Sequence, residues 1–474
     1  MSLQQLLLMR HEWILIASVL ILLGFELNFS EEKKSNSIVV AAILFAIVTL
    51  VGFLPAATGS IFGGMYITDP LRILMKNILN LGVLIVFLQS GSWLRTKINY
   101  NRVTEFYLLI LTSVIGLNFM ISSGHFLMFY LGLELLTIPI AAAASYDQFK
   151  SKSAEAGIKL ILSAAFSSAI LLFGLSILYG ASGSMYFQEV KFSVDLLQVL
   201  GFVFFFSGIA FKISIVPFHL WTADVYEGSP TNVTSYLSVV SKGAAIFVLI
   251  LLLVTLFEPL RQVWQQVIYG TAIFTMTIGN LFAIRQQNLK RFLAFSSIAQ
   301  AGFILLGVIG GSALGMASVI YFVLVYVFSN LAAFGVVIAI EENAGKVNMD
   351  DYNGLYKTNP RLSLVMMLAL FSLAGIPPLA GFFGKFFLFT AAAEGGYYVL
   401  LFIAVMNTII SLYYYLLVVK AMFINKNDLP VGYFQSDYFT RVALSACVVG
   451  ILVVGFYSPV FEYIQKLCFN YFNL

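Results

Sequence analysis

Long apolar runs alternate with short polar stretches along almost the whole chain. Most of these runs are close to 20 residues, which is about the length that an α-helix needs to cross the hydrocarbon core of a bilayer. The strands of a membrane β-barrel would instead give short segments in which apolar and polar residues alternate. The pattern therefore predicts an all-α protein that crosses a membrane many times.

About fourteen transmembrane spans are predicted. They lie near residues 12–29, 37–56, 71–91, 104–121, 125–145, 154–180, 196–219, 231–256, 262–284, 290–310, 313–340, 361–394, 397–422 and 440–460. Two of them contain prolines at which a helix is expected to break. The seventh breaks at Pro217, and the twelfth, which is too long for one straight crossing, breaks at the Gly375-Ile376-Pro377-Pro378 segment.

Composition supports a membrane protein and excludes several kinds of chemistry. The chain is 60% hydrophobic and only 10% charged, whereas soluble domains carry roughly 25% charged residues. Its two cysteines, Cys447 and Cys468, have no metal-ligand spacing. Because no Walker loop, Rossmann glycine pattern, CxxC or haem motif occurs, we expect neither ATP hydrolysis nor redox chemistry in this chain, and no nucleic-acid partner.

Loop charges predict how the chain is oriented in the membrane. Sixteen basic residues fall in alternate loops, and six fall on the other side with both termini. The sixteen are Lys33, Lys34, Arg95, Lys97, Arg102, Lys150, Lys152, Arg285, Lys290, Arg291, Lys346, Lys357, Arg361, Lys420, Lys426 and Arg441, and the six are Arg10, Arg72, Lys76, Lys191, Arg261 and Lys466. The positive-inside rule puts the sixteen in the cytoplasm and both termini outside. With no targeting segment, a bacterial inner membrane is expected.

The two broken helices also predict an internal repeat. They lie five spans apart, an odd number, so they run in opposite directions, as two inverted five-helix repeats would require. The expected divisions are a three-helix segment at 1–103, a first repeat at 104–256, a second repeat at 262–422, and a final helix at 440–460.

The loop count leaves four lysines, which the predicted spans place inside the membrane, and Glu134 lies near the middle of another span. The five residues are Glu134, Lys159, Lys212, Lys242 and Lys385. A charge in the middle of a membrane helix costs about 2.5–3.5 kcal/mol on insertion scales, so such groups mark ion or proton pathways. Burial disfavours the ammonium form of a lysine and a nearby carboxylate favours it. A row of such groups therefore predicts a proton relay in which Glu134 controls the charge of Lys212.

Each of these residues also has a purely structural interpretation. A lysine near the end of a span can extend its ammonium group to the membrane surface, which applies most to Lys159, with Glu155 four residues before it. Glu134 could be a static partner of a lysine. The loop charges place proton uptake near His219 and Asp224, on the basic side.

Several longer motifs carry a resemblance to a known family. They are LGLELLTIP around Glu134, EAGIK around Lys159, FKISIVPFHLWTADVYEGSPTNVTSYLSVVSK through Lys212 and Lys242, RQQNLKRFLAFSSIAQAGF at 285–303, LAGIPPLAGFFGK ending at Lys385, and SLYYYLLVVKAMF at 411–423. In this order they resemble the subunit N family of bacterial proton-pumping NADH-quinone oxidoreductase (respiratory complex I), the counterpart of mitochondrial NADH dehydrogenase subunit 2.

The resemblance implies an antiporter-like fold of fourteen helices with broken helices 7 and 12. It implies that Glu134 and Lys212 form a coupling pair, that Lys242 is the central relay, that Lys385 is the terminal residue, and that Lys159 is an additional lysine of the path. It further implies no cofactor in this chain, with NADH, FMN, iron–sulfur clusters and quinone bound by other subunits. The implied partners are the antiporter-like subunit M and the small K and J type subunits.

Two other functions stay open from the sequence. The first is a subunit of a multisubunit sodium/proton antiporter, because the D-type subunits of those antiporters share the fold. The second is an assembly or anchoring subunit with a vestigial channel. The D-type antiporter subunits, like the related subunits L and M, usually lack VYEGSPTNVTSYLSVVSK after the broken helix. Subunit M also usually has a glutamate where this chain has Lys385, which separates this chain from that subunit.

Overall fold

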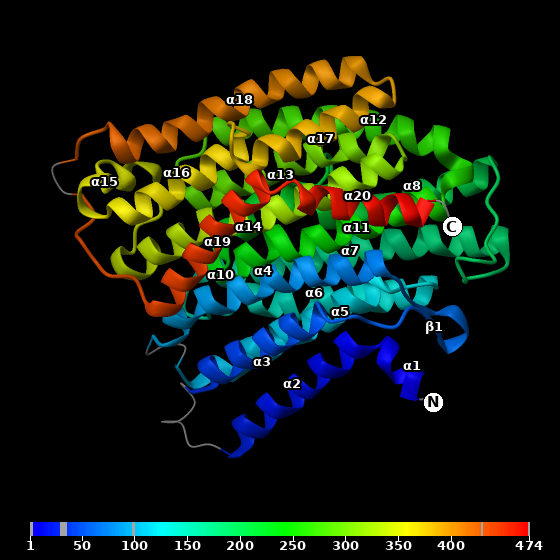
Figure 1. Cartoon of the computed structure of the whole chain (residues 1–474), viewed down its shortest axis with the longest axis horizontal. Helices are drawn as coiled ribbons and strands as arrows, with labels where there is room; N and C mark the ends of the chain where they lie inside the picture. The colour runs from blue at the N-terminus through cyan, green and yellow to red at the C-terminus, as the bar shows by residue number, and fades with distance from the viewer. Residues whose placement is uncertain (1–2, 29–35, 97–99, 428–429, 473–474) are drawn as a thin grey trace. The chain divides into compact units, whose positions relative to one another are not determined.

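The described chain is built almost entirely of helices, many of them of membrane-spanning length (Figure 1). The computed structural model describes residues 3–28, 36–96, 100–427 and 430–472. Within these residues, twelve helices are long and apolar enough to cross a membrane, and two shorter apolar helices span Asn36–Gly52 and Pro360–Ala374. Every predicted span has a helical counterpart, so the prediction of a multi-pass all-α protein is confirmed. Lys33, Lys34 and Lys97 of the charge count lie outside the described residues.

The chain divides into two compact units. Unit 1 comprises Met1–Lys212 and Val240–Arg261, and unit 2 comprises Ile213–Val239 and Gln262–Leu474. The two changes of unit at Lys212 and Val240 fall within helical segments of the stretch that carries Lys212 and Lys242. The predicted division into two five-helix repeats follows different boundaries and stays a prediction.

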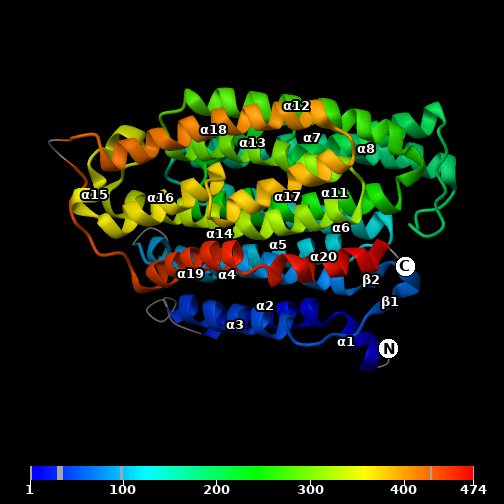
Figure 2. The ribbon, with the colours of Figure 1, turned by 45° about the horizontal axis from the view of Figure 1, so that its top comes forward.

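Unit 1 contains the first eight helices and the end of the eighth predicted span. Its elements are α1 (Leu3–Leu8), α2 (Arg10–Asn28), α3 (Asn36–Gly52), β1 (Gly59–Ile61), η2 (Phe62–Gly64), β2 (Tyr66–Thr68), α4 (Pro70–Leu94), η3 (Tyr100–Arg102), α5 (Val103–Ile121), α6 (Phe126–Ala144), α7 (Ser151–Ser182), α8 (Leu196–Ile213), α11 (Lys242–Thr255) and η5 (Glu258–Leu260). The blue helices α2 and α3 lie side by side in both views (Figure 2).

Unit 2 contains the remaining helices. They are α9 (Leu220–Gly228), α10 (Thr231–Tyr236), the π-helical turn η4 (Leu237–Ser241), α12 (Arg261–Ile284), α13 (Leu289–Ile309), α14 (Ala313–Ala344), η6 (Met349–Tyr352), α15 (Leu355–Thr358), α16 (Pro360–Ala374), α17 (Ala380–Glu394), α18 (Tyr398–Phe423), α19 (Tyr438–Phe456) and α20 (Pro459–Phe472). The core helices α13 and α14 are apolar around their whole circumference, and nearly all their residues are buried.

Three features were not predicted from the sequence. The stretch between the predicted spans 196–219 and 231–256 contains a helix, α9. The last predicted span ends near residue 460, yet a further amphipathic helix, α20, follows it. A short antiparallel hairpin pairs β1 with β2, where Gly63 and Gly64 have φ angles of 65° and 95° that favour glycine.

Close helix contacts in unit 1 depend on glycine. A Cβ atom on Gly116 of α5 would lie 2.4 Å from the backbone nitrogen of Leu136, and one on Gly132 of α6 would lie 2.5 Å from that of Met120. Lipid tails are as apolar as leucine, so membrane helices associate largely through such close packing of small residues. This contact holds α6, the helix that carries Glu134.

We predict that Gly116→Ala lowers the stability of the solubilised full chain, because the added methyl group has only backbone atoms to displace. Overpacking of this kind costs about 1–3 kcal/mol. Gly270→Ala in α12 is the matched control, because nothing lies within 4 Å of its added Cβ atom and alanine favours a helix interior by about 1 kcal/mol. Thermal unfolding followed by tryptophan fluorescence should give a lower midpoint for Gly116→Ala only, and equal midpoints would contradict the packing argument.

Candidate functional site

The seventh predicted helix breaks where expected. Helix α8 ends at Ile213, and Ser214 takes a left-handed conformation with φ 68°. The break is held by two hydrogen bonds, because the Thr222 hydroxyl donates to Ser214 Oγ at 2.8 Å and the Val216 amide donates to Thr275 Oγ1 at 3.0 Å. The Thr275 hydroxyl thus gives the Val216 amide a partner that the interrupted helix does not supply.

Lys212 lies in the last turn of α8 and is 7% exposed. Its ammonium group donates to Thr137 Oγ1 at 2.7 Å, and the Thr137 hydroxyl in turn donates to the Leu133 carbonyl of α6 at 2.6 Å. The end of a helix carries partial negative charge, which favours a cation. The lysine is therefore held by a neutral hydroxyl and by the end of its own helix.

Glu134 lies on α6, three residues before Thr137, and is partly buried. Its carboxylate accepts a hydrogen bond from the Ser168 hydroxyl of α7. A pocket of about 10 Å³ is lined by Ser168, Thr137 and Lys212, which is close to the space that one water molecule needs. The Ser168 hydroxyl, bonded to Glu134, and the Thr137 hydroxyl, bonded to Lys212, therefore line the same small pocket.

Lys159 differs from the other lysines. It lies on α7, its side chain is 42% exposed, and it pairs with Glu155 at 2.7 Å. The predicted i, i+4 pair is confirmed, but the side chain is on the surface of the chain. Exposed pairs of this kind contribute about 0–1 kcal/mol in water. A purely structural role therefore fits Lys159 better than it fits the three buried lysines.

Lys242 begins α11, directly after the π-helical turn η4, and is 3% exposed. A π turn inserts one residue into a helix, and such turns occur frequently at functional sites. The sequence of Leu237–Ser241 does not predict this π turn. The turn sets the direction in which α11 presents the lysine.

Lys385 lies beside the second break. Helix α16 ends at Ala374, and Gly375 takes a left-handed conformation with φ 87°. The Lys385 ammonium group, on α17, donates to the Ala374 carbonyl at 3.0 Å and lies 4.6 Å from the centre of the Phe303 ring. Carbonyl and ring both present negative potential to the cation, which is only 3% exposed.

The two breaks share a local design that the sequence did not reveal. In each, a residue with positive φ, Ser214 or Gly375, stands three positions before a proline, Pro217 or Pro378. In each, a buried lysine lies at the end of the first half-helix. Lys212 is part of that half-helix, whereas Lys385 is on the second half-helix and its ammonium group contacts the end of the first. Serine carries no strong sequence signal for a left-handed residue, so only Gly375 could have been predicted.

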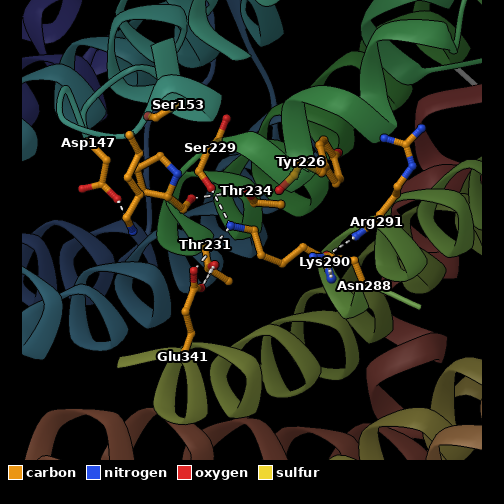
Figure 3. Close-up of polar contacts among 12 residues, drawn as sticks. Asp147, Ser153, Tyr226, Ser229, Thr231, Thr234, Asn288, Lys290, Arg291 and Glu341 are labelled. Atoms are coloured by element: carbon orange, nitrogen blue, oxygen red, sulfur yellow. Dashed lines mark hydrogen bonds and ion pairs between the residues drawn. The ribbon is translucent and has the colours of Figure 1, made fainter. Parts of the chain in front are cut away.

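A polar network in unit 2 fixes the segment that follows α9 (Figure 3). Lys290, 5% exposed, donates to the Ser229 carbonyl at 2.8 Å and lies 3.7 Å from Glu341 Oε1, and Thr231 donates to the same carboxylate. Beside it, Arg291 binds Asp224 at 2.6 Å. Asp224, expected near proton uptake, is thus already paired with a guanidinium group.

A buried ion pair between Lys76 and Glu12 was not predicted from the sequence. The Lys76 ammonium group, 0% exposed, lies 2.6 Å from Glu12 Oε1. The Tyr66 hydroxyl donates to Glu12 Oε2 at 2.8 Å and accepts from Lys76 at 3.0 Å. The assignment of Lys76 to the loop charges is therefore wrong. Both residues lie inside predicted spans, 12–29 and 71–91, but the sequence does not show that the two spans bring them together.

Comparisons with known proteins identify the same fold and family. The family model described as "NADH:quinone oxidoreductase/Mrp antiporter, TM" matches residues 123–411. A protein of Phocaeicola vulgatus named NADH-quinone oxidoreductase subunit N is 50% identical over 425 residues, which cover 89% of this chain and 90% of the relative. Its namesake from Azobacteroides pseudotrichonymphae is 49% identical and covers 99% of both chains.

Solved structures give the same result. A chain of respiratory complex I from Thermus thermophilus with bound aureothin has a TM-score of 0.78 and 30% identity, with 94% of this chain and 96% of that chain covered. A chain of the Mrp complex from Dietzia has a TM-score of 0.81 at 19% identity, with 99% and 97% covered. The second likeness shows the fold alone, and together they confirm the expected antiporter-like fold.

The Glu12–Lys76 pair gives a prediction about stability. Removing one partner of a buried pair leaves an uncompensated charge and typically costs 3–5 kcal/mol, whereas replacing both can be nearly neutral. Glu12→Gln should therefore destabilise the chain strongly, and adding Lys76→Met should recover most of that loss. Unfolding midpoints of the two single variants and the double variant form a cycle, and additive losses would contradict a direct pair.

Proposed function

The chain belongs to the NADH:quinone oxidoreductase/Mrp antiporter transmembrane family, and from this premise we propose that it is a proton-translocating membrane-arm subunit of an NADH-quinone oxidoreductase. Proteins of this name share up to 50% identity with it over most of its length. The observation that carries the proposal is that Lys212 and Lys385 are buried, each at the end of a half-helix. A static subunit has little reason to keep such groups in a membrane.

The first step of the proposed mechanism belongs to Glu134 and Lys212. The ammonium form of Lys212 is favoured by the carboxylate of Glu134 and by the end of α8. A change in the charge or position of Glu134 would weaken that support, so the lysine would release its proton. The Thr137 and Ser168 hydroxyls, which bind Lys212 and Glu134, supply groups that both donate and accept along the short path between them.

The later steps are assigned from the family resemblance. Lys242 acts as the central relay and Lys385 as the terminal residue. The resemblance also assigns Lys159 to the path, although its exposed pair with Glu155 gives this assignment less structural support than that of the buried lysines. Lys385 gains its stability as a cation from the Ala374 carbonyl and the Phe303 ring. Moving one charge against 100 mV costs about 2.3 kcal/mol, so changes in such local contacts are of the right size to drive each step.

The energy comes from redox chemistry elsewhere in the complex. The described residues hold no group of three or more His, Cys, Asp or Glu side chains that could bind a metal ion. We assign NADH, FMN, iron–sulfur clusters and quinone to other subunits, and the contacts of this chain to M, K and J type subunits. We place it in a bacterial inner membrane with both termini outside, as the loop charges indicate.

The sodium/proton antiporter remains the alternative. Its support is a likeness of fold at 19% identity, whereas the relatives that are far more similar in sequence carry the NADH-quinone oxidoreductase name. Sodium-dependent proton movement in vesicles without NADH would favour the antiporter.

We predict that Lys212→Met or Glu134→Gln lowers proton pumping at least about tenfold, because each removes one member of the coupling pair and a change of 1.4 kcal/mol is already a factor of ten. Pumping would be measured in inverted membrane vesicles supplied with NADH, with assembly checked on native gels. Lys152→Met, at an exposed position of α7, is the control. Full pumping in either variant would mean that the substituted residue is not part of the relay.

Thr137→Val tests the hydroxyl that holds Lys212. A hydrogen bond to a charged group contributes about 1.5–3 kcal/mol, so pumping should fall about tenfold, and Thr137→Ser should restore it. Thr112→Val is the matched control, because Thr112 makes the same bond to a carbonyl four residues back, at 2.7 Å, without a lysine partner. Equal effects of the two valine variants would mean that the hydroxyl matters only for helix geometry.

A further inference from the structure

A groove of about 690 Å³ runs between α16 and α19 of unit 2, and none of the proposed relay residues lines it. Its size lies in the range of about 300–1,000 Å³ that is typical of small-molecule sites. Helix α19 is long and apolar enough to cross a membrane, and α16 is one of the two shorter apolar helices. The groove therefore runs along two helices whose composition suits a lipid environment.

One end of the groove is basic. Arg361, in the first turn of α16, and Arg441, in the first turn of α19, both line it and are both exposed. Two guanidinium groups offer planar pairs of donors that match the oxygen atoms of a phosphate. Asp437, four residues before Arg441, accepts a hydrogen bond from the Phe439 amide at 3.1 Å and caps α19.

Most of the other side chains that line the groove from α16 and α19 are apolar. Leu364 and Leu368 line it from α16, and Leu444 and Val448 line it from α19. Each pair is four residues apart, so each forms a continuous stripe along its helix. The stripes begin one turn beyond the arginines, which gives a polar end and an apolar body in the same cavity.

The polar end is held in place by side-chain bonds. Asn359, 4% exposed, donates to the Gly432 carbonyl at 3.0 Å and accepts from the Phe434 amide at 3.4 Å. These bonds fix the segment that carries Tyr433, which lines the groove and is 77% exposed. Tyrosine in this position is typical of the boundary between membrane and water, the depth at which lipid headgroups lie.

We propose that this groove binds an anionic phospholipid, with its phosphate between Arg361 and Arg441 and an acyl chain along the stripes of α16 and α19. Basic pockets between membrane helices are suited to such headgroups. A zwitterionic lipid would bring its cationic amine toward the same two guanidinium groups, so it binds less well. None of the proposed relay residues lines the groove, so this site stands apart from proton translocation.

The test uses the assembled complex in nanodiscs that contain a phosphatidylglycerol with a photoactivatable acyl chain. After illumination, mass spectrometry measures the label on peptides from α16 and α19. Labelling should fall about tenfold in Arg361→Gln/Arg441→Gln, since two charge-assisted contacts are lost. It should persist in Arg285→Gln/Lys420→Gln, which removes the same charge from exposed positions elsewhere in unit 2.

A second variant tests the apolar body without changing charge. Val448→Trp fills the space between the stripes, so it should reduce labelling while Tyr413→Trp, at an exposed position of α18, leaves it unchanged. Three results would overturn the proposal. They are equal labelling by a phosphatidylcholine probe, labelling that is unchanged in the arginine variant, and no labelling because another subunit covers the groove in the complex.

Discussion

The structure depends on how an ammonium group is held inside a membrane helix bundle. An unpaired buried charge is too costly to keep, and a strong fixed ion pair cannot easily exchange a proton. Lys212 and Lys385 are held in a way that lies between these two cases. Their hydrogen-bond acceptors are a hydroxyl and a carbonyl, and each lysine lies at the end of a half-helix, where the partial negative charge of carbonyl groups favours the cation. The breaks in the two helices create these half-helix ends.

The Glu12–Lys76 pair shows the other extreme. Both side chains are fully buried, their charged atoms are 2.6 Å apart, and Tyr66 binds both. Each charge has a direct opposite charge and an added hydroxyl partner, which fits a fixed link between α2 and α4. Lys76 of the three-helix segment therefore differs physically from the relay lysines Lys212 and Lys385. Lys76 is held by a full opposite charge, whereas the other two are held by the dipoles of a hydroxyl or carbonyl group.

Much of this could be predicted from the sequence, because long apolar runs and prolines act locally. The spans follow from length, the breaks from Pro217 and Pro378, and the buried lysines from charges inside those spans. The rest depends on contacts between distant segments. No local signal shows that Thr137 binds Lys212, that Phe303 lies over Lys385, or that Lys76 is buried against Glu12. The π turn before Lys242 arises from packing that the sequence pattern does not reveal.

The central claim is that the buried lysines change their protonation state and do more than supply positive charge. Arginine tests this directly, because it keeps the charge but does not lose its proton in proteins. The measurement is NADH-driven proton pumping in vesicles whose complex carries Lys385→Arg and is assembled at the normal level. We predict that pumping is lost although the positive charge beside Ala374 remains. Pumping at the normal rate in that variant would contradict the account, because a fixed cation would then be sufficient.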